Sequence, residues 1–279
     1  MGRYPFPIVQ PARGSLPVLL SIPHSGRDYE PEVLANAAHG RRALELLEDP
    51  LVDRLAWRAI GAGFGAVMQP VPRAVIDCNR DEDELDPAAI EGIGPVAVGP
   101  RARHGLGLIP SRTHRDGALW RWPIDRAELA RRIEQVHRPY HQALADGVQA
   151  LKACHGEALL LDCHSMPPRR QVQADVVIGD RHGTSAAAWI SNEAMRIIQG
   201  AGLKAALNDP YAGGSIVARH GRPGLGVHAL QLEIDRSLYL DSDSRGAGRG
   251  FDRISLLVEA LATNLGRALL DGHLRVAAE

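Results

Sequence analysis

The chain has 279 residues, of which 45% are hydrophobic, enough to fill the core of one large α/β domain or of two small ones. Its 32 Lys and Arg residues nearly balance its 33 Asp and Glu residues. This balance excludes the strong basic field of proteins that bind nucleic acid or anionic membranes, and it favours a small-molecule partner.

Cysteine usage and hydropathy indicate where such a protein would work. Three cysteines without a C-x-x-C pair argue against a disulfide framework and a thiolate zinc site, and they favour a reducing compartment. Met1–Gln10 lacks a basic region followed by an apolar stretch, and no run of about 18 apolar residues occurs in the sequence. We therefore expect a cytoplasmic protein. The sequence shows no internal repeats and no low-complexity tracts, so we expect a single domain over residues 1–279.

The first predicted elements are a buried strand and a helix. Leu16–Ile22 is an almost continuous apolar run, typical of a buried parallel strand, and His24 follows its end. Apolar residues then recur in a helical rhythm from Pro50 to Ile60. Asp49 directly before Pro50 predicts the N-cap of that helix.

A second strand and a long loop follow. The apolar segments 66–68 and 74–80 predict a strand that runs into a polar turn. Residues 81–123 are rich in Gly and Pro and lack periodicity, which predicts a long ordered loop over a site.

The rest of the sequence alternates helices and strands. Asp125 with Glu128 predicts a capping box, and helical spacing continues to about His155, with a kink expected at Pro139. The later elements are a strand at 158–163 followed by His164, a strand at 176–179, a helix at 186–198, a strand at 227–234 and a helix at 254–270. This alternation predicts a three-layer αβα fold whose mostly parallel sheet carries helices on both faces.

Candidate metal ligands lie near the strand ends, where open parallel sheets bind ligands. His24 and His164 follow two predicted strands, and Asp49 lies at the predicted helix start. Two nitrogens and one carboxylate oxygen suit a catalytic zinc ion whose fourth position is left for water. Asp53, one helical turn after Asp49, is an alternative ligand. The two histidines are equally compatible with hydrogen bonds to a loop.

Other histidines offer rival sites. His137 and His141 share a helix face at i and i+4 but lack the internal glutamate of H-E-x-x-H, so helix packing is favoured over metal binding. His220 and His228 are further candidates. Their glycine-rich surroundings favour a substrate loop over a rigid metal scaffold.

Eight sequence segments between about Leu19 and Asp241 form a specific combination. They are Ser21–Gly26, Asp49, Pro72–Arg80, Gly107–Pro110, Arg138–His141, Leu161–Ser165, Gly213–Gly214 with Arg219–His220, and Gly226–Glu233. In this order they resemble the N-formylglutamate amidohydrolase family. That family looks related to zinc-dependent exopeptidases, which implies a phosphorylase/hydrolase-like α/β fold.

The resemblance implies an activity and a metal site. The activity is hydrolysis of N-formyl-L-glutamate to L-glutamate and formate. His24, Asp49 and His164 would be the ligands of one Zn²⁺ or another divalent ion, and Glu233 the catalytic base. From the residues alone, Glu233 could instead be a buried carboxylate paired with Arg236.

By the same resemblance, Asn79 and Arg80 would hold a substrate carboxylate. A substrate with two carboxylates needs a second cation, for which Arg73 or Arg219, beside His220, is the candidate. Each arginine is also compatible with a surface ion pair.

Three other functions stay open. The first is a related metallohydrolase that acts on another N-acyl amino acid or on a peptide terminus. The second is a small-molecule binding module that lacks metal. The third is a serine hydrolase that uses Ser25 or Ser165, although the sequence lacks the G-x-S-x-G elbow that would support it.

Overall fold

A seven-stranded sheet is the framework of the computed structural model, which describes residues 4–94, 99–168, 174–243 and 245–276. The strands lie in the order β1 (Ile8–Gln10), β3 (Gly65–Met68), β2 (Val18–Ile22), β6 (Ala158–Met166), β9 (Val227–Asp235), β7 (Val176–Gly179) and β8 (Ala205–Leu207). β6 pairs in parallel with β2 and β9, and β7 pairs in parallel with β8 but antiparallel with β9. The expected mostly parallel sheet is confirmed.

The chain divides into two compact units. The loop unit comprises Met1–Ile8, Pro23–Glu48 and Met68–Gln142, and the sheet unit comprises Val9–Ile22, Asp49–Val67 and Ala143–Glu279. Helical elements of the sheet unit are α3 (Val52–Leu55), α4 (Trp57–Gly61), most of α7 (Arg138–His155), α8 (Ala188–Gly200), α9 (Ser215–His220), η2 (Pro223–Leu225), η3 (Arg236–Leu238) and α10 (Phe251–Val276). Elements of the loop unit include α1 (Pro31–Asn36), α2 (Gly40–Glu45), α5 (Pro100–Arg103), β4 (Arg112–Thr113), β5 (Gly117–Ala118), α6 (Arg126–Arg132) and η1 (Ile133–His137). The expectation of one domain stays a prediction.

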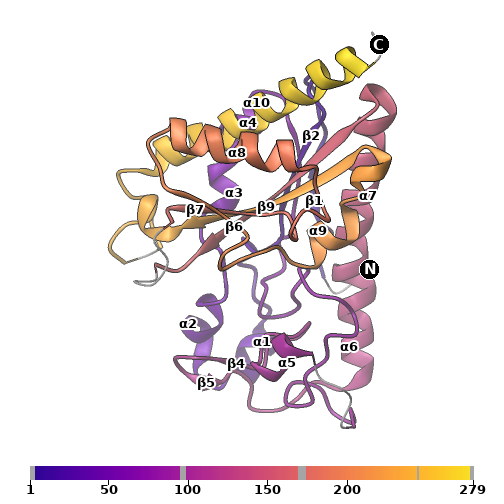
Figure 1. Ribbon diagram of the computed structural model, residues 1–279. Helices are drawn as coiled ribbons and strands as arrows, with labels where there is room; N and C mark the ends of the chain where they lie inside the picture. The colour runs from indigo at the N-terminus through magenta and orange to yellow at the C-terminus, as the bar shows by residue number, and fades with distance from the viewer. Residues whose placement is uncertain (1–3, 95–98, 169–173, 244, 277–279) are drawn as a thin grey trace. The chain divides into compact units, whose positions relative to one another are not determined.

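Helices cover both faces of the sheet. Val18 and Leu19 of β2 point to opposite faces because side chains alternate along a strand. A Cβ at Gly266 of α10 would lie 3.1 Å from Val18, and a Cβ at Gly147 of α7 would lie 2.8 Å from Leu19. The missing side chains let each helix approach its own face. Figure 1 shows α8 and α10 together along one of these faces. The three-layer αβα arrangement is therefore confirmed.

The two central strands carry both the core and polar groups. All nine residues of β6 are buried, and so is every residue of β9 except Asp235. Burial on both faces explains why these strands appear in the sequence as continuous apolar runs. The polar residues among them gather toward the carboxyl ends. Among the described residues, no helix is long and apolar enough to cross a membrane.

The helix expected from Pro50 to Ile60 is wrong at its start. α3 begins only at Val52, and Leu51 at its N-cap has a left-handed backbone with φ 60°. Asp49 does not cap the helix, because its carboxylate accepts a hydrogen bond from Arg236 at 3.0 Å. A tertiary ion pair replaces the local cap that the sequence predicts.

The strand expected at 74–80 is also wrong, because this segment forms turns. Side chains of the helical stretch from α6 to α7 bind its carbonyl groups in place of a neighbouring strand. The contacts are Arg132 to Val75 O at 2.8 Å, His137 to Arg80 O at 2.8 Å and His141 to Cys78 O at 3.0 Å. The polar turn that follows is thereby fixed without a sheet.

The same helical stretch begins as its sequence suggests, and a π-helical turn interrupts it before Pro139. The Asp125 carboxylate accepts a hydrogen bond from the backbone N–H of Glu128 at 2.6 Å, so the predicted N-cap is confirmed. A π-helical turn, η1, directly precedes Pro139. Since Pro139 lacks an N–H and its ring clashes with the carbonyl of residue 135, the regular hydrogen-bond ladder is interrupted there.

The segment expected as a long loop, 81–123, contains only α5 and the small β4–β5 hairpin as regular elements among its described residues. Residues 95–98 of it lie outside the described residues. The indole N–H of Trp120 donates to Pro110 O at 2.6 Å, and Leu108 and Leu119 are fully buried. The described part of the loop is thus ordered by packing.

Candidate active site

In the sheet unit, a carboxylate and an imidazole face each other at the end of β6. Asp49 and His164 are each 2% exposed, and Oδ2 of Asp49 lies 3.1 Å from Nδ1 of His164. Two ligands of a tetrahedral zinc ion lie about 3.3 Å apart when each bond is about 2.0 Å long. The pair therefore has the spacing of two ligands of one metal ion. Asp49, rather than Asp53, is the carboxylate placed against His164.

The other ring nitrogen of His164 is held from within the sheet. Nε2 lies 2.8 Å from Oδ2 of Asp162, and the Ser21 hydroxyl donates to Oδ1 of Asp162 at 2.7 Å. Asp162 and His164 share a face of β6 because they are two residues apart on a strand. Metal-ligating histidines commonly give their second nitrogen to a carboxylate. This contact leaves Nδ1 as the nitrogen that faces Asp49.

The electrostatics at His164 favour positive charge. Burial alone would lower the pKa of His164, but the carboxylates of Asp162 and Asp49 raise it well above its usual value, and Glu233 adds to this effect. An environment that stabilises a proton on the ring also stabilises a cation at Nδ1. The donor atoms and their charges therefore fit a divalent metal ion.

Glu233 emerges beside His164. The two residues are register partners on the parallel strands β6 and β9, so their side chains leave the same face of the sheet. The Gln231 amide donates to Oε1 of Glu233 at 2.9 Å, and Glu233 is 9% exposed. Arg236, its alternative partner from the sequence, donates to Asp49. Glu233 is thus a buried carboxylate next to a candidate ligand.

In the loop unit, His24 is held in the same manner. It is 2% exposed, and its Nε2 lies 2.7 Å from Oδ1 of the fully buried Asp77. Gly26 follows closely, and a Cβ there would lie 2.4 Å from Pro70 O, so this turn requires glycine. The backbone therefore fixes the position of His24 on one side and Asp77 fixes its ring on the other.

Asp77 is also the centre of a cationic cluster. Arg73 donates to its Oδ2 at 2.8 Å, and Nε of Arg80 lies 3.8 Å from the same oxygen. Burial alone would raise the pKa of Asp77, but Arg73, Arg80 and His24 lower it well below its usual value. The guanidinium of Arg80 also donates to two backbone carbonyls, those of Leu106 and Asn79. One buried carboxylate thus faces two guanidinium groups.

The remaining histidines and arginine from the sequence have different surroundings. His137 and His141 are buried and bind the backbone of the 74–80 segment, as their helix-packing interpretation expects. His220 ends α9, where burial and the neighbouring Arg219 lower its pKa to about 4. His228 lies within β9, 3.9 Å from Glu157.

Comparison with known proteins identifies the family. The model of the N-formylglutamate amidohydrolase family matches residues 16–240. This chain belongs to the N-formylglutamate amidohydrolase family.

Two curated relatives are N-formylglutamate deformylases. The protein of Pseudomonas aeruginosa is 30% identical over 85% of this chain and 87% of its own length, and that of Pseudomonas putida is 28% identical over 82% and 84%. The crystal structure of N-formylglutamate amidohydrolase from Ralstonia eutropha is 31% identical, with a TM-score of 0.87 over 96% of this chain and 99% of that one. Membership in the N-formylglutamate amidohydrolase family makes this chain an enzyme that hydrolyses an amide bond.

Four side chains make contacts in the candidate site of this amidohydrolase that sequence reasoning did not predict. They are Ser21 and Asp162 behind His164, Asp77 behind His24, and Arg236 beside Asp49. Asp162 could have been found from the sequence, because an aspartate two residues before a histidine on a strand shares its face and can reach its ring. The other contacts join residues between 53 and 187 positions apart, so no local pattern marks them.

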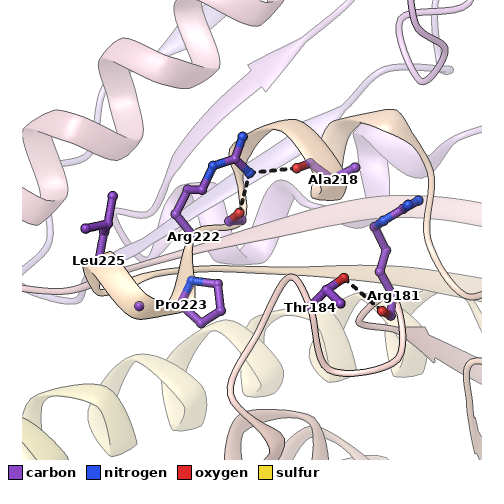
Figure 2. A pocket seen from close by; sticks show the side chains of 8 residues that line it. Arg181, Thr184, Ala218, Arg222, Pro223 and Leu225 are labelled. Atoms are coloured by element: carbon purple, nitrogen blue, oxygen red, sulfur yellow. Dashed lines mark hydrogen bonds between the residues drawn. The ribbon is translucent and has the colours of Figure 1, made fainter.

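A separate pocket of about 530 Å³ lies on the sheet unit of the amidohydrolase. Figure 2 shows Arg181 and Arg222 on opposite sides of it. Arg222 donates to the carbonyls of Ala218 and Gly221 at 2.8 and 2.6 Å, which fixes its guanidinium against the end of α9. The pocket is lined by none of the residues predicted to bind metal or substrate.

Proposed function

We propose that this enzyme hydrolyses N-formyl-L-glutamate to L-glutamate and formate with one divalent metal ion, most simply Zn²⁺, bound by His24, Asp49 and His164. The two deformylases, which this chain matches over most of its length, support this substrate. The observation that carries the metal is the facing pair of Asp49 Oδ2 and His164 Nδ1, with the second nitrogen of His164 already engaged by Asp162.

Chain connectivity supports His24 as the third ligand. In the β2–β6 pairing, Ser21 lies opposite Asp162. His24 follows Ser21 by three residues, and His164 follows Asp162 by two. Equivalent positions of parallel strands lead toward the same edge of a sheet, and this connectivity supports the proposal that both histidines serve one site.

Glu233 is the proposed general base and acid. A divalent metal bound at this site would supply a water of lowered pKa and polarise the amide carbonyl. Glu233, adjacent to His164 on β9, accepts the proton of the attacking water and returns it to the departing amine. The Gln231 amide donates to Oε1 of Glu233 and so orients its carboxylate.

The positive cluster of the loop unit is proposed to bind substrate carboxylate. Arg80 donates its two hydrogen bonds to neutral backbone carbonyls. The carboxylate of Asp77 lies 3.8 Å from its Nε. Asn79 and Arg73 lie in the same turn. Arg219 and His220 of the sheet unit are the proposed contacts to the second carboxylate. Such charge-assisted pairs with a carboxylate are strong and directional.

A formate-release assay tests the proposal. Purified enzyme is expected to release formate from N-formyl-L-glutamate, to lose this activity after exhaustive chelation and to regain it when Zn²⁺ is added back. N-formyl-L-glutamine, which lacks one carboxylate, is expected to be a poorer substrate. Full activity in protein shown to be metal-free would reject the metal. Release of another acyl group but not formate would reject the substrate.

A further inference from the structure

The short segment that carries Asp49 is held by two residues of a distant turn. Arg236 of η3 donates through NH2 to Oδ1 of Asp49 at 3.0 Å. Tyr239, three residues later, donates through its hydroxyl to the carbonyl of Pro50 at 2.8 Å. Tyr239 is fully buried, and the Arg236 side chain is 15% exposed. Side chain and backbone of the segment are therefore held from the same turn.

The segment needs such support because it is neither helix nor strand. Pro50 has no N–H to donate, and Leu51 adopts a left-handed backbone with φ 60° and ψ 11°. A leucine in this region is sterically strained and persists only when its surroundings impose it.

The two oxygens of the Asp49 carboxylate have different partners. Oδ1 is taken by Arg236, while Oδ2 points at Nδ1 of His164 from 3.1 Å. Arg236 further donates through Nε to the hydroxyl of Ser165 at 3.1 Å. Since Ser165 follows His164 in β6, one guanidinium ties together the two segments that carry candidate ligands.

We propose that Arg236 and Tyr239 are positioning residues that fix Asp49 as a one-oxygen metal ligand, oriented with Oδ2 toward the ion and Oδ1 toward Arg236. The inference rests on the proposed function, because it takes Asp49 and His164 as ligands. Neither residue contacts the substrate in this assignment. Their effect is therefore on the affinity for metal and not on the affinity for substrate.

The test measures Zn²⁺ affinity of apoprotein by competition with a chromophoric chelator. Arg236→Gln is expected to weaken Zn²⁺ binding by about 10- to 100-fold, the usual effect of losing a partner of a metal ligand. Arg236→Lys keeps the charge but not the planar fork and should recover part of the loss. Tyr239→Phe removes one hydroxyl from a buried ring and should have a smaller effect in the same direction.

Controls separate positioning from general destabilisation. Arg196→Gln removes the same charge from an exposed pair with Glu193 on α8 and should leave Zn²⁺ affinity unchanged. Thermal unfolding of each apoprotein identifies variants that do not fold. If Arg236→Gln does not fold, Arg236→Lys and Tyr239→Phe decide the matter with the same measurement.

The possible outcomes distinguish failure of the positioning role from failure of the proposed function. With saturating Zn²⁺, KM for N-formyl-L-glutamate should stay within about twofold of wild type in folded variants. Wild-type Zn²⁺ affinity in both Arg236→Gln and Tyr239→Phe would overturn the inference while the proposed function stands. A raised KM with unchanged Zn²⁺ affinity would also overturn it and would make Arg236 a substrate-binding residue. Failure of the wild-type protein to bind one Zn²⁺ per chain would overturn the metal itself.

Discussion

Two histidines, one in each unit, are held alike by different parts of the chain. Nε2 of His164 lies 2.8 Å from Asp162, and Nε2 of His24 lies 2.7 Å from Asp77. Asp162 is two residues from its histidine on a regular strand, whereas Asp77 lies in a turn 53 residues away. The sheet unit obtains the contact from strand geometry, and the loop unit obtains it from tertiary folding.

The groups behind the two carboxylates also differ. The neutral hydroxyl of Ser21 holds Asp162, whereas the guanidinium of Arg73 holds Asp77, with Arg80 close by. The carboxylate that orients an imidazole can thus itself be held by a neutral hydroxyl or by a guanidinium group. The charged version couples His24 to the turn proposed to bind substrate, and we expect it to be the more sensitive of the two to mutation.

The largest expected effect comes from the histidines themselves. His164→Ala and His24→Ala should each abolish metal binding and reduce formate release to the level of the chelated enzyme, because each removes one of three proposed ligands. Metal content per chain and kcat/KM are the measurements. Wild-type metal content in either variant would show that its histidine is not a ligand. The two histidines would then differ in function although they are held alike.

Glu233→Gln should separate chemistry from metal binding. The amide cannot carry a proton, so kcat should fall by about 10²- to 10⁴-fold while the metal stays bound. The amide also keeps the shape that packs beside Gln231, so the variant should fold. A rate near that of wild type would exclude Glu233 as the base, and loss of metal would instead place it among the groups that hold the ion.

The two supporting carboxylates test the comparison directly. Asp77→Asn leaves Arg73 and Arg80 without their buried counter-charge and should cost roughly 3–5 kcal/mol of stability. Asp162→Asn keeps the hydrogen bond from Ser21 but removes the buried counter-charge of one imidazole, 2.8 Å away, and should cost about 1.5–3 kcal/mol. Both should weaken Zn²⁺ binding by about 10- to 100-fold. Equal losses of unfolding free energy in urea would show that charge does not distinguish the units.

The fold was predictable where burial is continuous along the sequence. β6, β7 and β9 are apolar runs that need no partner to be recognised, and the helix that follows Asp125 shows both its cap and its periodicity. The segment 74–80 starts with an apolar run like that of a strand, but side chains from α6 to α7 bind its carbonyls instead. Local hydrophobicity cannot distinguish these two ways of burying a backbone.

The candidate site was predictable in its residues but not in their contacts. The sequence predicts a strand that ends just before His164, whereas β6 continues through His164 to Met166. The ligand roles of His24, Asp49 and His164 stay predictions. The surroundings of Asp49 could not be inferred, because the Asp-Pro pair is a strong local signal for an N-cap. Arg236, 187 residues later, overrides that signal with a tertiary ion pair.

The smallest expected effect is a pH dependence of the loop unit. Glu128 of α6 is a second carboxylate in this unit held by cations, because Arg131 and Arg132 both donate to it, together with the Tyr4 hydroxyl. Burial alone would raise the pKa of Glu128, but the hydrogen bonds from Tyr4, Arg132 and Arg131 lower it from 4.5 to about 2. The folded state therefore favours the ionised form.

The sign of the effect follows from that lowered pKa. Stability from Glu128 is fully present above pH 4.5 and is lost as the pH falls through about 2, because protons then bind the unfolded chain first. Glu128→Gln should lower the free energy of unfolding by about 1–2 kcal/mol at pH 7, a figure that already allows for the solvent exposure of Arg131. Near pH 2 the substitution should have almost no effect. Urea unfolding midpoints of wild type and variant, measured between pH 2 and 7, give the difference in stability.

Glu193→Gln, which breaks a surface pair with Arg196 in the sheet unit, is the matched control and should change the midpoint less. A loss in Glu128→Gln that persists unchanged at pH 2 would mean that packing, and not charge, is what Glu128 contributes.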